Sequence, residues 1–156
     1  MTEPSALPSS IAPSGRRILL AEDNPQDVFL LREAFLSENI PADFDCVPDG
    51  DQLLERLLSL FAGGRDPYAL VVLDAHLPKR SAEEVLCALS RQQKRLNVPV
   101  VVLTNMISDR DKEKLLGLGV CEIFSKPLDL SDYFSLVHRL AALMDPGLQM
   151  HFQRRP

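Results

Sequence analysis

The sequence predicts an α/β fold in which helices cover both faces of a five-stranded parallel sheet. Short apolar runs alternate with segments of helical periodicity along most of the 156 residues. Strict alternation of this kind is the pattern of a parallel sheet built from βαβ units. The runs at residues 70–73 and 100–103 contain only Val and Leu, which is typical of strands buried on both faces. Apolar residues make up 46% of the chain, which is enough for one full core.

The first strand is predicted over residues 17–22, and a helix follows it directly. Asn24 is a favoured N-cap residue, and Pro25 suits the first position of a helix. Asp27 stands three residues after this cap, in the first turn. Apolar side chains at helical spacing mark the inward side of the helix, and these are Val28, Leu31 and Phe35.

The other four strand–helix pairs show the same signals. Leucines recur at three-to-four spacing in the second helix, and Val85, Leu86 and Leu89 form the inward side of the third. The fourth helix is charged and is closed by Gly119, and the fifth is long. The predicted strands are 43–47, 70–73, 100–103 and 120–125, and the predicted helices are 51–61, 81–93, 109–118 and 130–144.

The predicted domain covers residues 16–145, between an N-terminal tail at 1–15 and a C-terminal tail at 146–156. The first tail is rich in Pro and Ser and lacks the apolar centre of a signal peptide. The second is too short for a DNA-binding domain. No apolar run reaches the roughly 20 residues of a membrane span, and the net charge of -5 gives no reason to expect nucleic-acid binding. We therefore expect a cytoplasmic protein with neither a membrane nor a nucleic acid as partner.

The cysteines point to the same compartment. The chain has three, Cys46, Cys87 and Cys121, and no pair has CxxC spacing, so a zinc site or a redox dithiol is not indicated. Each lies within an apolar pattern, and we expect buried free thiols in a reducing environment.

Polar residues stand where several of the predicted strands end. Glu22 and Asp23 close the first strand, Asp74 the third, Thr104 the fourth and Lys126 the fifth. In open parallel sheets, ligands bind outside the carboxyl ends of the strands, at the point where the strand order reverses. We therefore expect these five side chains to converge on one site.

The residue types predict phosphoryl chemistry at a metal. Three clustered carboxylates repel one another, and a divalent cation relieves this repulsion. Oxygen ligands without His or Cys favour Mg²⁺, with Glu22 and Asp23 binding it directly or through water. Asp74 is the expected nucleophile for a phosphoryl group, because it ends the strand expected at the sheet centre. Lys126 and Thr104 are expected to contact the phosphoryl oxygens.

Four motifs carry a resemblance to the receiver domains of two-component response regulators. They are LLAEDN with its acidic pair, VVLDAHLP with Asp74 four residues before Pro78, VVVLT ending at Thr104, and FSKPL with Lys126. The resemblance covers about residues 16–145. The stretches LLAEDNPQDVFLLREAF and HLPKRSAEEVL further resemble single-domain regulators that accompany bacteriophytochrome sensor kinases.

The resemblance implies a role for each site residue. Asp74 would accept a phosphoryl group from a histidine of a sensor kinase, and Thr104 and Lys126 would contact that group. The chain would catalyse only its own phosphorylation and dephosphorylation, and it would signal through protein contacts or a phosphorelay. The implied Mg²⁺ ligands are the side chains of Glu22, Asp23 and Asp74 and the backbone carbonyl of His76.

The resemblance also implies a flavodoxin-like doubly wound (βα)5 fold with strand order 2-1-3-4-5 and a cis peptide bond between Lys126 and Pro127. Three positions depart from the family pattern. Ala82 stands where a glycine is usual, Ile123 replaces an aromatic residue that takes part in switching, and Asn105 replaces a small residue. None of them removes a group that phosphorylation needs.

Two other functions stay open at this point. One is a Mg²⁺-dependent phosphatase or phosphotransferase with an Asp nucleophile. Such enzymes usually carry a second acid two residues after the nucleophile, where this chain has His76. The other is a receiver-like scaffold that is never phosphorylated, against which the complete set of acids, Thr104 and Lys126 argues.

The helix at 130–144 predicts a homodimer. It carries more apolar residues than a surface helix needs for one stripe. The stripe expected against the sheet is Leu130, Phe134, Val137, Ala141 and Met144. The second stripe, expected to pack against a partner chain, is Tyr133, Leu136, Leu140 and Leu143.

Overall fold

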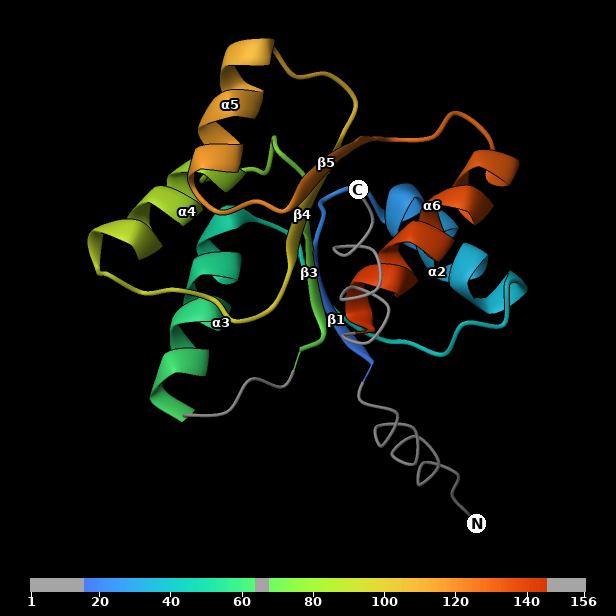
Figure 1. Cartoon of the computed structure of the whole chain (residues 1–156), viewed down its shortest axis with the longest axis horizontal. Helices are drawn as coiled ribbons and strands as arrows, with labels where there is room; N and C mark the ends of the chain where they lie inside the picture. Colours follow the sequence, from blue (N-terminus) through green and yellow to red (C-terminus); the bar gives the residue numbers. More distant parts are fainter. Residues whose placement is uncertain (1–15, 64–67, 146–156) are drawn as a thin grey trace, which may run out of the picture.

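A single parallel sheet forms the centre of the computed structural model, which describes residues 16–63 and 68–145 (Figure 1). Its strand order is β2-β1-β3-β4-β5, so the predicted fold class and strand order are confirmed. The predicted tails at 1–15 and 146–156 lie outside the described residues. The strands are β1 (Arg17–Ala21), β2 (Asp43–Val47), β3 (Leu70–Leu73), β4 (Val100–Thr104) and β5 (Glu122–Ser125).

Helices cover both faces of this sheet. In Figure 1, α2 and α6 lie on one side, and α3, α4 and α5 lie on the other. Within the described ranges, no helix is both long and apolar enough to cross a membrane. The helices are α2 (Pro25–Ser37), α3 (Gly50–Gly63), α4 (Ala82–Arg91), α5 (Asp109–Gly117) and α6 (Leu130–Met144).

Each face of the sheet has its own hydrophobic core. Alternate residues of a strand point to opposite faces, so Leu19 of β1 joins the core under α3, α4 and α5, whereas Ile18 and Leu20 join the core under α2 and α6. All three side chains are almost completely buried. Burial on both faces explains why the sequences of the central strands are uninterrupted apolar runs.

The register of the strands brings their carboxyl ends to one edge. Ala21 is paired with Val47 on one side and with Leu73 on the other, and Thr104 is paired with Ser125. The residues that follow β1, β3, β4 and β5 therefore emerge side by side.

Side-chain caps fix the starts of the helices. Asn24 Oδ1 accepts a hydrogen bond from Gln26 N at 2.9 Å, with Pro25 as the first helical residue, as predicted. Ser81 caps α4 and forms a capping box with Glu84. These caps set the points at which the chain turns from the site edge into a helix.

Of the two stripes predicted on α6, the inward one is confirmed for Val137 and Met144, and the partner-facing one is wrong. Tyr133, Leu136 and Leu140 of the expected partner-facing stripe are buried in the core of this chain, whereas Leu130 of the expected inward stripe is 44% exposed. The physical reason is that α6 packs against α2 as well as against the sheet, so its buried side is centred between the two stripes. An uncovered second stripe is therefore absent from the described part of α6.

The expected burial of the cysteines is also wrong. Cys46 and Cys121 are exposed and Cys87 is half-buried, although all three are free thiols. Cys46 belongs to β2 and Cys121 directly precedes β5, and these are the two edge strands of the sheet. An edge strand is covered less completely by the helices than a central one, so an apolar pattern there does not guarantee burial.

Candidate functional site

Three carboxylates meet at the carboxyl edge of the sheet. Glu22 and Asp23 follow β1, and Asp74 follows its neighbour β3, so the fold joins residues that are far apart in the sequence. One ligand atom from each lies within 4.8 Å of the others. Glu22 and Asp74 are buried, whereas Asp23 is exposed. The predicted convergence of these residues is thus present in the structure.

Lys126 lies among the carboxylates. Its Nζ is 2.9 Å from Glu22 Oε1, 3.0 Å from Asp74 Oδ2 and 2.8 Å from Asp27 Oδ2, and its side chain is 6% exposed. An ammonium group has three N–H donors, and three carboxylates receive them here. Sequence reasoning assigned Asp27 only to the start of a helix. The signal that could have found it is its place in the first turn after β1, next to the site edge.

The electrostatics of the site follow from burial and mutual contact. Burial raises the pKa of Glu22 to about 7, with a further rise from Asp74 and opposing hydrogen bonds from Lys126 and the Asn24 amide. Burial would lower the pKa of Lys126, but its hydrogen bonds to Asp27, Glu22 and Asp74 outweigh burial and raise it. One ammonium cannot neutralise this many acids, so an all-oxygen set with excess negative charge fits a cation such as Mg²⁺.

Thr104 adds a hydroxyl without a partner. It is 2% exposed at the end of β4, and its Oγ1 has no hydrogen-bond partner within the described structure. A buried hydroxyl that makes no hydrogen bond costs about 1–3 kcal/mol. Such a group is available to a ligand that brings an acceptor or a donor into the site.

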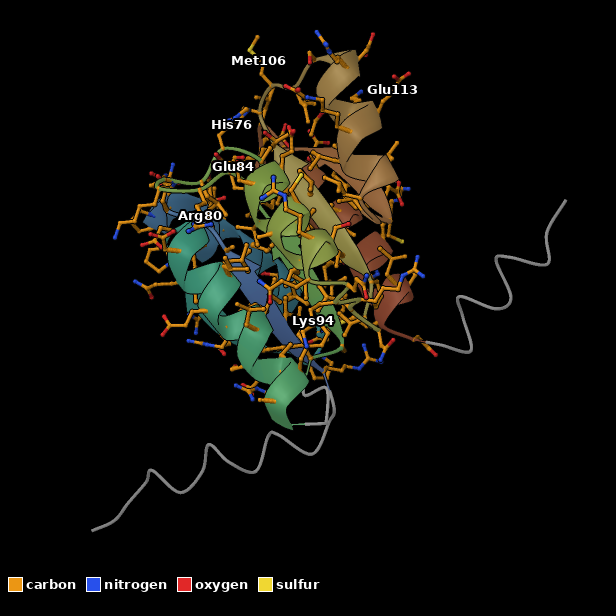
Figure 2. The ribbon with its side chains drawn as sticks, turned by 90° about the vertical axis from the view of Figure 1, so that its left-hand side faces the viewer. His76, Arg80, Glu84, Lys94, Met106 and Glu113 are labelled. Atoms are coloured by element: carbon orange, nitrogen blue, oxygen red, sulfur yellow. The ribbon has the colours of Figure 1, made fainter. Side chains whose placement is uncertain are left out.

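His76 links two loops at the rim of the site. Its backbone N–H donates to Asp74 Oδ1 at 3.0 Å, and its ring Nε2 lies 2.9 Å from the carbonyl oxygen of Met106. Figure 2 shows His76 and Met106 at the same end of the molecule. The predicted binding of a metal by the backbone carbonyl of His76 is not tested by these contacts and stays a prediction.

The Lys126–Pro127 peptide bond is trans, because no cis bond occurs in the described residues, and the expected cis bond is therefore wrong. The trans form is the lower-energy one for most X–Pro bonds. Lys126 reaches the three carboxylates with its backbone N–H donating to the carbonyl oxygen of Thr104 at 2.9 Å.

A cavity of about 580 Å³ lies away from these residues, between the C-terminal parts of α4 and α5. Leu86, Leu89 and Leu116 contribute to its lining, and Lys94 and Arg95 are its ionisable residues. Figure 2 places Lys94 far from His76. With no carboxylate or histidine in its lining, this cavity offers none of the chemistry found at the strand ends.

Comparison with known families explains the set of residues at the strand ends. Residues 18–138 match the family model of the response regulator receiver domain. The chain belongs to this family. The five strands and the helices between them are thus those of a receiver domain, and the acidic cluster lies at the carboxyl edge of its sheet.

Several relatives of this receiver domain are regulatory proteins. The probable methanogenesis regulatory protein FilR2 of Methanothrix harundinacea is 35% identical over 115 residues, which is 74% of each chain. Response regulator Rcp1 of Synechocystis is 30% identical over 121 residues, 77% of this chain and 82% of Rcp1. The receiver domain spans about half the length of the transcriptional regulators TctD of Salmonella typhimurium and TcrA of Mycobacterium tuberculosis, which it also matches.

Solved structures give the same picture. The phosphorylated cyanobacterial phytochrome response regulator RcpA superposes with a TM-score of 0.66 at 30% identity, over 80% of this chain and 90% of RcpA. The Mn²⁺-bound form of Rcp1 superposes with a TM-score of 0.65 at 27% identity, over 81% and 92% of the two chains.

Proposed function

We propose that this receiver domain accepts a phosphoryl group on Asp74 from a phosphohistidine of a sensor histidine kinase, in a Mg²⁺-dependent reaction. The phosphorylated domain would then signal through protein contacts or pass the group on in a phosphorelay. Membership of the family supports a kinase partner. The likeness to RcpA, whose structure is that of a phosphorylated phytochrome response regulator, favours a kinase of the bacteriophytochrome type. The cytoplasm remains the proposed compartment.

The observation that carries the proposal is the surroundings of Asp74. Its buried carboxylate lies 3.0 Å from Lys126 Nζ and belongs to the acidic cluster with Glu22 and Asp23. Asp74 follows β3, and Thr104, whose hydroxyl has no partner in the described structure, ends the neighbouring strand β4. A nucleophilic carboxylate, a cation and a free hydroxyl are the groups that phosphoryl transfer uses.

A metal fits the donor set of the site. Glu22, Asp23 and Asp74, with the backbone carbonyl of His76, would hold Mg²⁺, and the Mn²⁺-bound form of Rcp1 supports a divalent ion in a relative. When bound, Mg²⁺ would neutralise charge on the phosphoryl oxygens.

The residues of the chain would act in a simple exchange. A carboxylate oxygen of Asp74 attacks phosphorus, the P–N bond to the kinase histidine breaks, and the imidazole leaves with the electron pair of that bond. Lys126 and the hydroxyl of Thr104 would contact phosphoryl oxygens, where negative charge is concentrated. The product is an acyl phosphate on Asp74.

We propose further that the chain is not an enzyme with a separate substrate, and that it catalyses only its own phosphorylation and dephosphorylation. A phosphatase with an Asp nucleophile would usually have an acid at the position of His76. The ring Nε2 of His76 is 2.9 Å from the Met106 carbonyl oxygen instead. Repeated turnover of a small phosphoester would favour the phosphatase, and complete absence of phosphorylation would favour a scaffold.

Phosphorylation with a small acyl phosphate tests the proposal. Wild type should gain one phosphoryl group in the presence of Mg²⁺, detected by intact-protein mass spectrometry and mapped to Asp74. Asp74→Asn should not gain it. Asp49→Asn is the matched control, because Asp49 is also a buried aspartate, directly before α3, but lies outside the acidic cluster. Labelling of Asp74→Asn at the wild-type rate, or labelling without Mg²⁺, contradicts the proposal.

A homodimer through the region of α6 is also proposed, but its support is now the exposed leucines at the start of the helix and not a second apolar stripe. Leu128 is 97% exposed and Leu130 is 44% exposed, at the start of the helix. Leu128 lines the groove of about 340 Å³ between β5 and α6, and Leu130 is the first residue of α6. Burial of these leucines against a second copy would remove apolar surface from water.

A further inference from the structure

The three carboxylates around Lys126 do not have equivalent roles. Lys126 Nζ has its shortest contact, 2.8 Å, with Asp27 Oδ2. Glu22 and Asp74, the other two partners, also belong to the acidic cluster that fits a metal, whereas Asp27 lies outside that cluster. Asp27 is thus the one partner of Lys126 with no second function in the proposed chemistry.

Phosphorylation changes the other two partners. Glu22 and Asp74 would turn oxygens to the metal, and the oxygen of Asp74 that forms the acyl phosphate becomes a poor acceptor. A phosphoryl oxygen then takes the place of that carboxylate oxygen as a partner of Lys126. Asp27 would bind neither the metal nor the phosphoryl group, so both its oxygens stay available to the ammonium while the other bonds are exchanged.

We propose that Asp27 is a positioning residue, which anchors Lys126 so that its ammonium group meets the phosphoryl group formed on Asp74. The inference rests on the proposed phosphorylation of Asp74 and deepens it. Lys126 exchanges its bond with Asp74 for one with a phosphoryl oxygen and keeps its bond with Asp27. Without this anchor, the long lysine side chain would spread over several rotamers, and each productive arrangement would be less populated.

The position of Asp27 suits an anchor. It stands in the first turn of α2, behind the Asn24 cap and Pro25, and its side chain is 21% exposed. A residue on a capped helix is held more rigidly than one on a loop. Of the groups that raise the pKa of Lys126 against the opposing effect of burial, the hydrogen bond to Asp27 contributes most.

Tyr133 supplies a spectroscopic reporter of this anchor. It is buried on α6 in the core shared with α2, and burial raises its pKa with a further rise from the charge of Asp27 and a smaller lowering from Lys126. Its phenol ring therefore senses both charges. The chain has no Trp and two Tyr, so Tyr68→Phe leaves Tyr133 as the only source of tyrosine emission.

The first experiment compares initial rates of phosphorylation by a small acyl phosphate at saturating Mg²⁺. We expect Asp27→Asn to be phosphorylated about three- to tenfold more slowly than wild type, because one group that contacts the phosphoryl oxygens is less well positioned. Asp27→Glu, which keeps the charge, should recover part of the rate. Glu33→Gln, the same charge change on the same helix at a residue that is not among the partners of Lys126, should keep the wild-type rate.

A double-mutant cycle separates positioning from a general structural or charge effect. In the Lys126→Met background, Asp27→Asn should cause no further slowing, because the lysine it positions is gone. Equal slowing in both backgrounds, or a wild-type rate for Asp27→Asn, overturns the proposal. Urea unfolding of each variant shows whether a slowly phosphorylated variant is folded. If Asp27→Asn does not fold, Asp27→Glu takes its place in the cycle.

The emission of Tyr133 distinguishes failure of the anchor from failure of the proposed function. In the Tyr68→Phe background without phosphodonor, Asp27→Asn should change the emission by a different amount when Lys126 is present than in Lys126→Met, because loss of the anchor also moves the ammonium group. Glu33→Gln should not change the emission in either background. If wild type takes up no phosphoryl group, the proposed function is wrong and this comparison still tests the anchor. An equal change in emission with and without Lys126, together with an unchanged rate, shows that Asp27 does not hold Lys126.

Discussion

Thr104 places a hydroxyl in the core at the end of β4, where the described structure gives it no hydrogen-bond partner. Its neighbours along β4 are buried Val and Leu side chains, so the hydroxyl is the exception in an apolar strand. A polar atom left unsatisfied in this way lowers stability, and the proposed compensation is its contact with the phosphoryl group.

We predict that Thr104→Val leaves the free energy of unfolding unchanged or raises it by up to about 1 kcal/mol, because it replaces an unsatisfied hydroxyl with a methyl group of similar size. The same variant should retain its phosphoryl group for a different time from wild type. Urea unfolding and the decay of the phosphorylated species measure the two effects. A loss of stability well above 1 kcal/mol would show that the hydroxyl makes a hydrogen bond in the folded protein.

Asp45, in the middle of the edge strand β2, has a structural role outside the site. Its Oδ2 accepts hydrogen bonds from Arg56 of α3 and from Tyr68, and Arg17 lies 3.8 Å away. Burial would raise the pKa of Asp45, but these hydrogen bonds and charges outweigh it and hold the pKa below the ordinary value of 3.8. A lowered pKa means that the carboxylate contributes stability above pH 3.8, and that this contribution is lost as the pH falls through the lower folded value.

We predict that Asp45→Asn lowers the free energy of unfolding at pH 7 by about 1–3 kcal/mol, because the charged acceptor for the Arg56 and Tyr68 donors is lost. The difference from wild type should narrow as the pH falls below 3.8, because the unfolded wild-type chain then binds a proton at Asp45 before the folded chain does. Denaturant unfolding at pH 7 and at pH 3 measures it. Asp43→Asn on the same strand is the control, and a narrowing of equal size there would contradict the assignment.

At the scale of elements, the loop that follows Asp74 is fastened to the start of α3. Gly50 N donates to the carbonyl oxygen of Pro78 at 3.0 Å. Two ion pairs flank this bond, between Lys79 and Asp49 and between Arg80 and Asp51. The close approach holds the loop that carries His76 next to the site.

Gly50→Ala should destabilise the protein, because an added Cβ would lie 1.9 Å from the carbonyl oxygen of Arg80. Overpacking of this kind costs about 1–3 kcal/mol. Gly117→Ala is the matched control in α5, where a Cβ meets nothing within 4 Å, and it should stabilise the helix by up to about 1 kcal/mol. Thermal unfolding of both variants decides, and equal melting temperatures would show that the loop does not approach α3 this closely.

At the scale of the whole molecule, one side of α6 is buried in the core, and the start of the helix is exposed. Its buried side, which includes Leu136 and Leu140, belongs to the core under α2, so glutamate at either position would disrupt the fold instead of testing association. The exposed leucines at the start of the helix, Leu128 and Leu130, are the positions that a partner chain could cover.

We predict that the wild type sediments as a dimer at tens of micromolar, roughly the range for modest interfaces, and that Leu128→Glu/Leu130→Glu sediments as a monomer. The charged side chains would leave water at a cost if they were covered. Leu36→Glu on α2, which replaces a leucine that is 70% exposed, is the control and should not change association. A monomeric wild type, with and without phosphodonor and Mg²⁺, contradicts the homodimer.

Local sequence patterns were enough to predict the fold class and most of the site. Strand and helix periods, the cap at Asn24, and the polar residues at the strand ends are local signals, because each depends on neighbours along the chain. In a parallel sheet the carboxyl ends of the strands meet at one edge, so local signals were enough to predict that Glu22, Asp74 and Lys126 lie close together.

Features that depend on the packing of distant elements became visible only in the folded molecule. Which side of α6 is buried depends on α2, and the exposure of Cys46 depends on its place on an edge strand. Asp27 is a partner of Lys126 although 99 residues separate them in the sequence. The contact depends on the direction in which α2 leaves the site edge. Side-chain partners so far apart in the sequence are set by helix orientation and depth of packing, and no local pattern encodes these quantities.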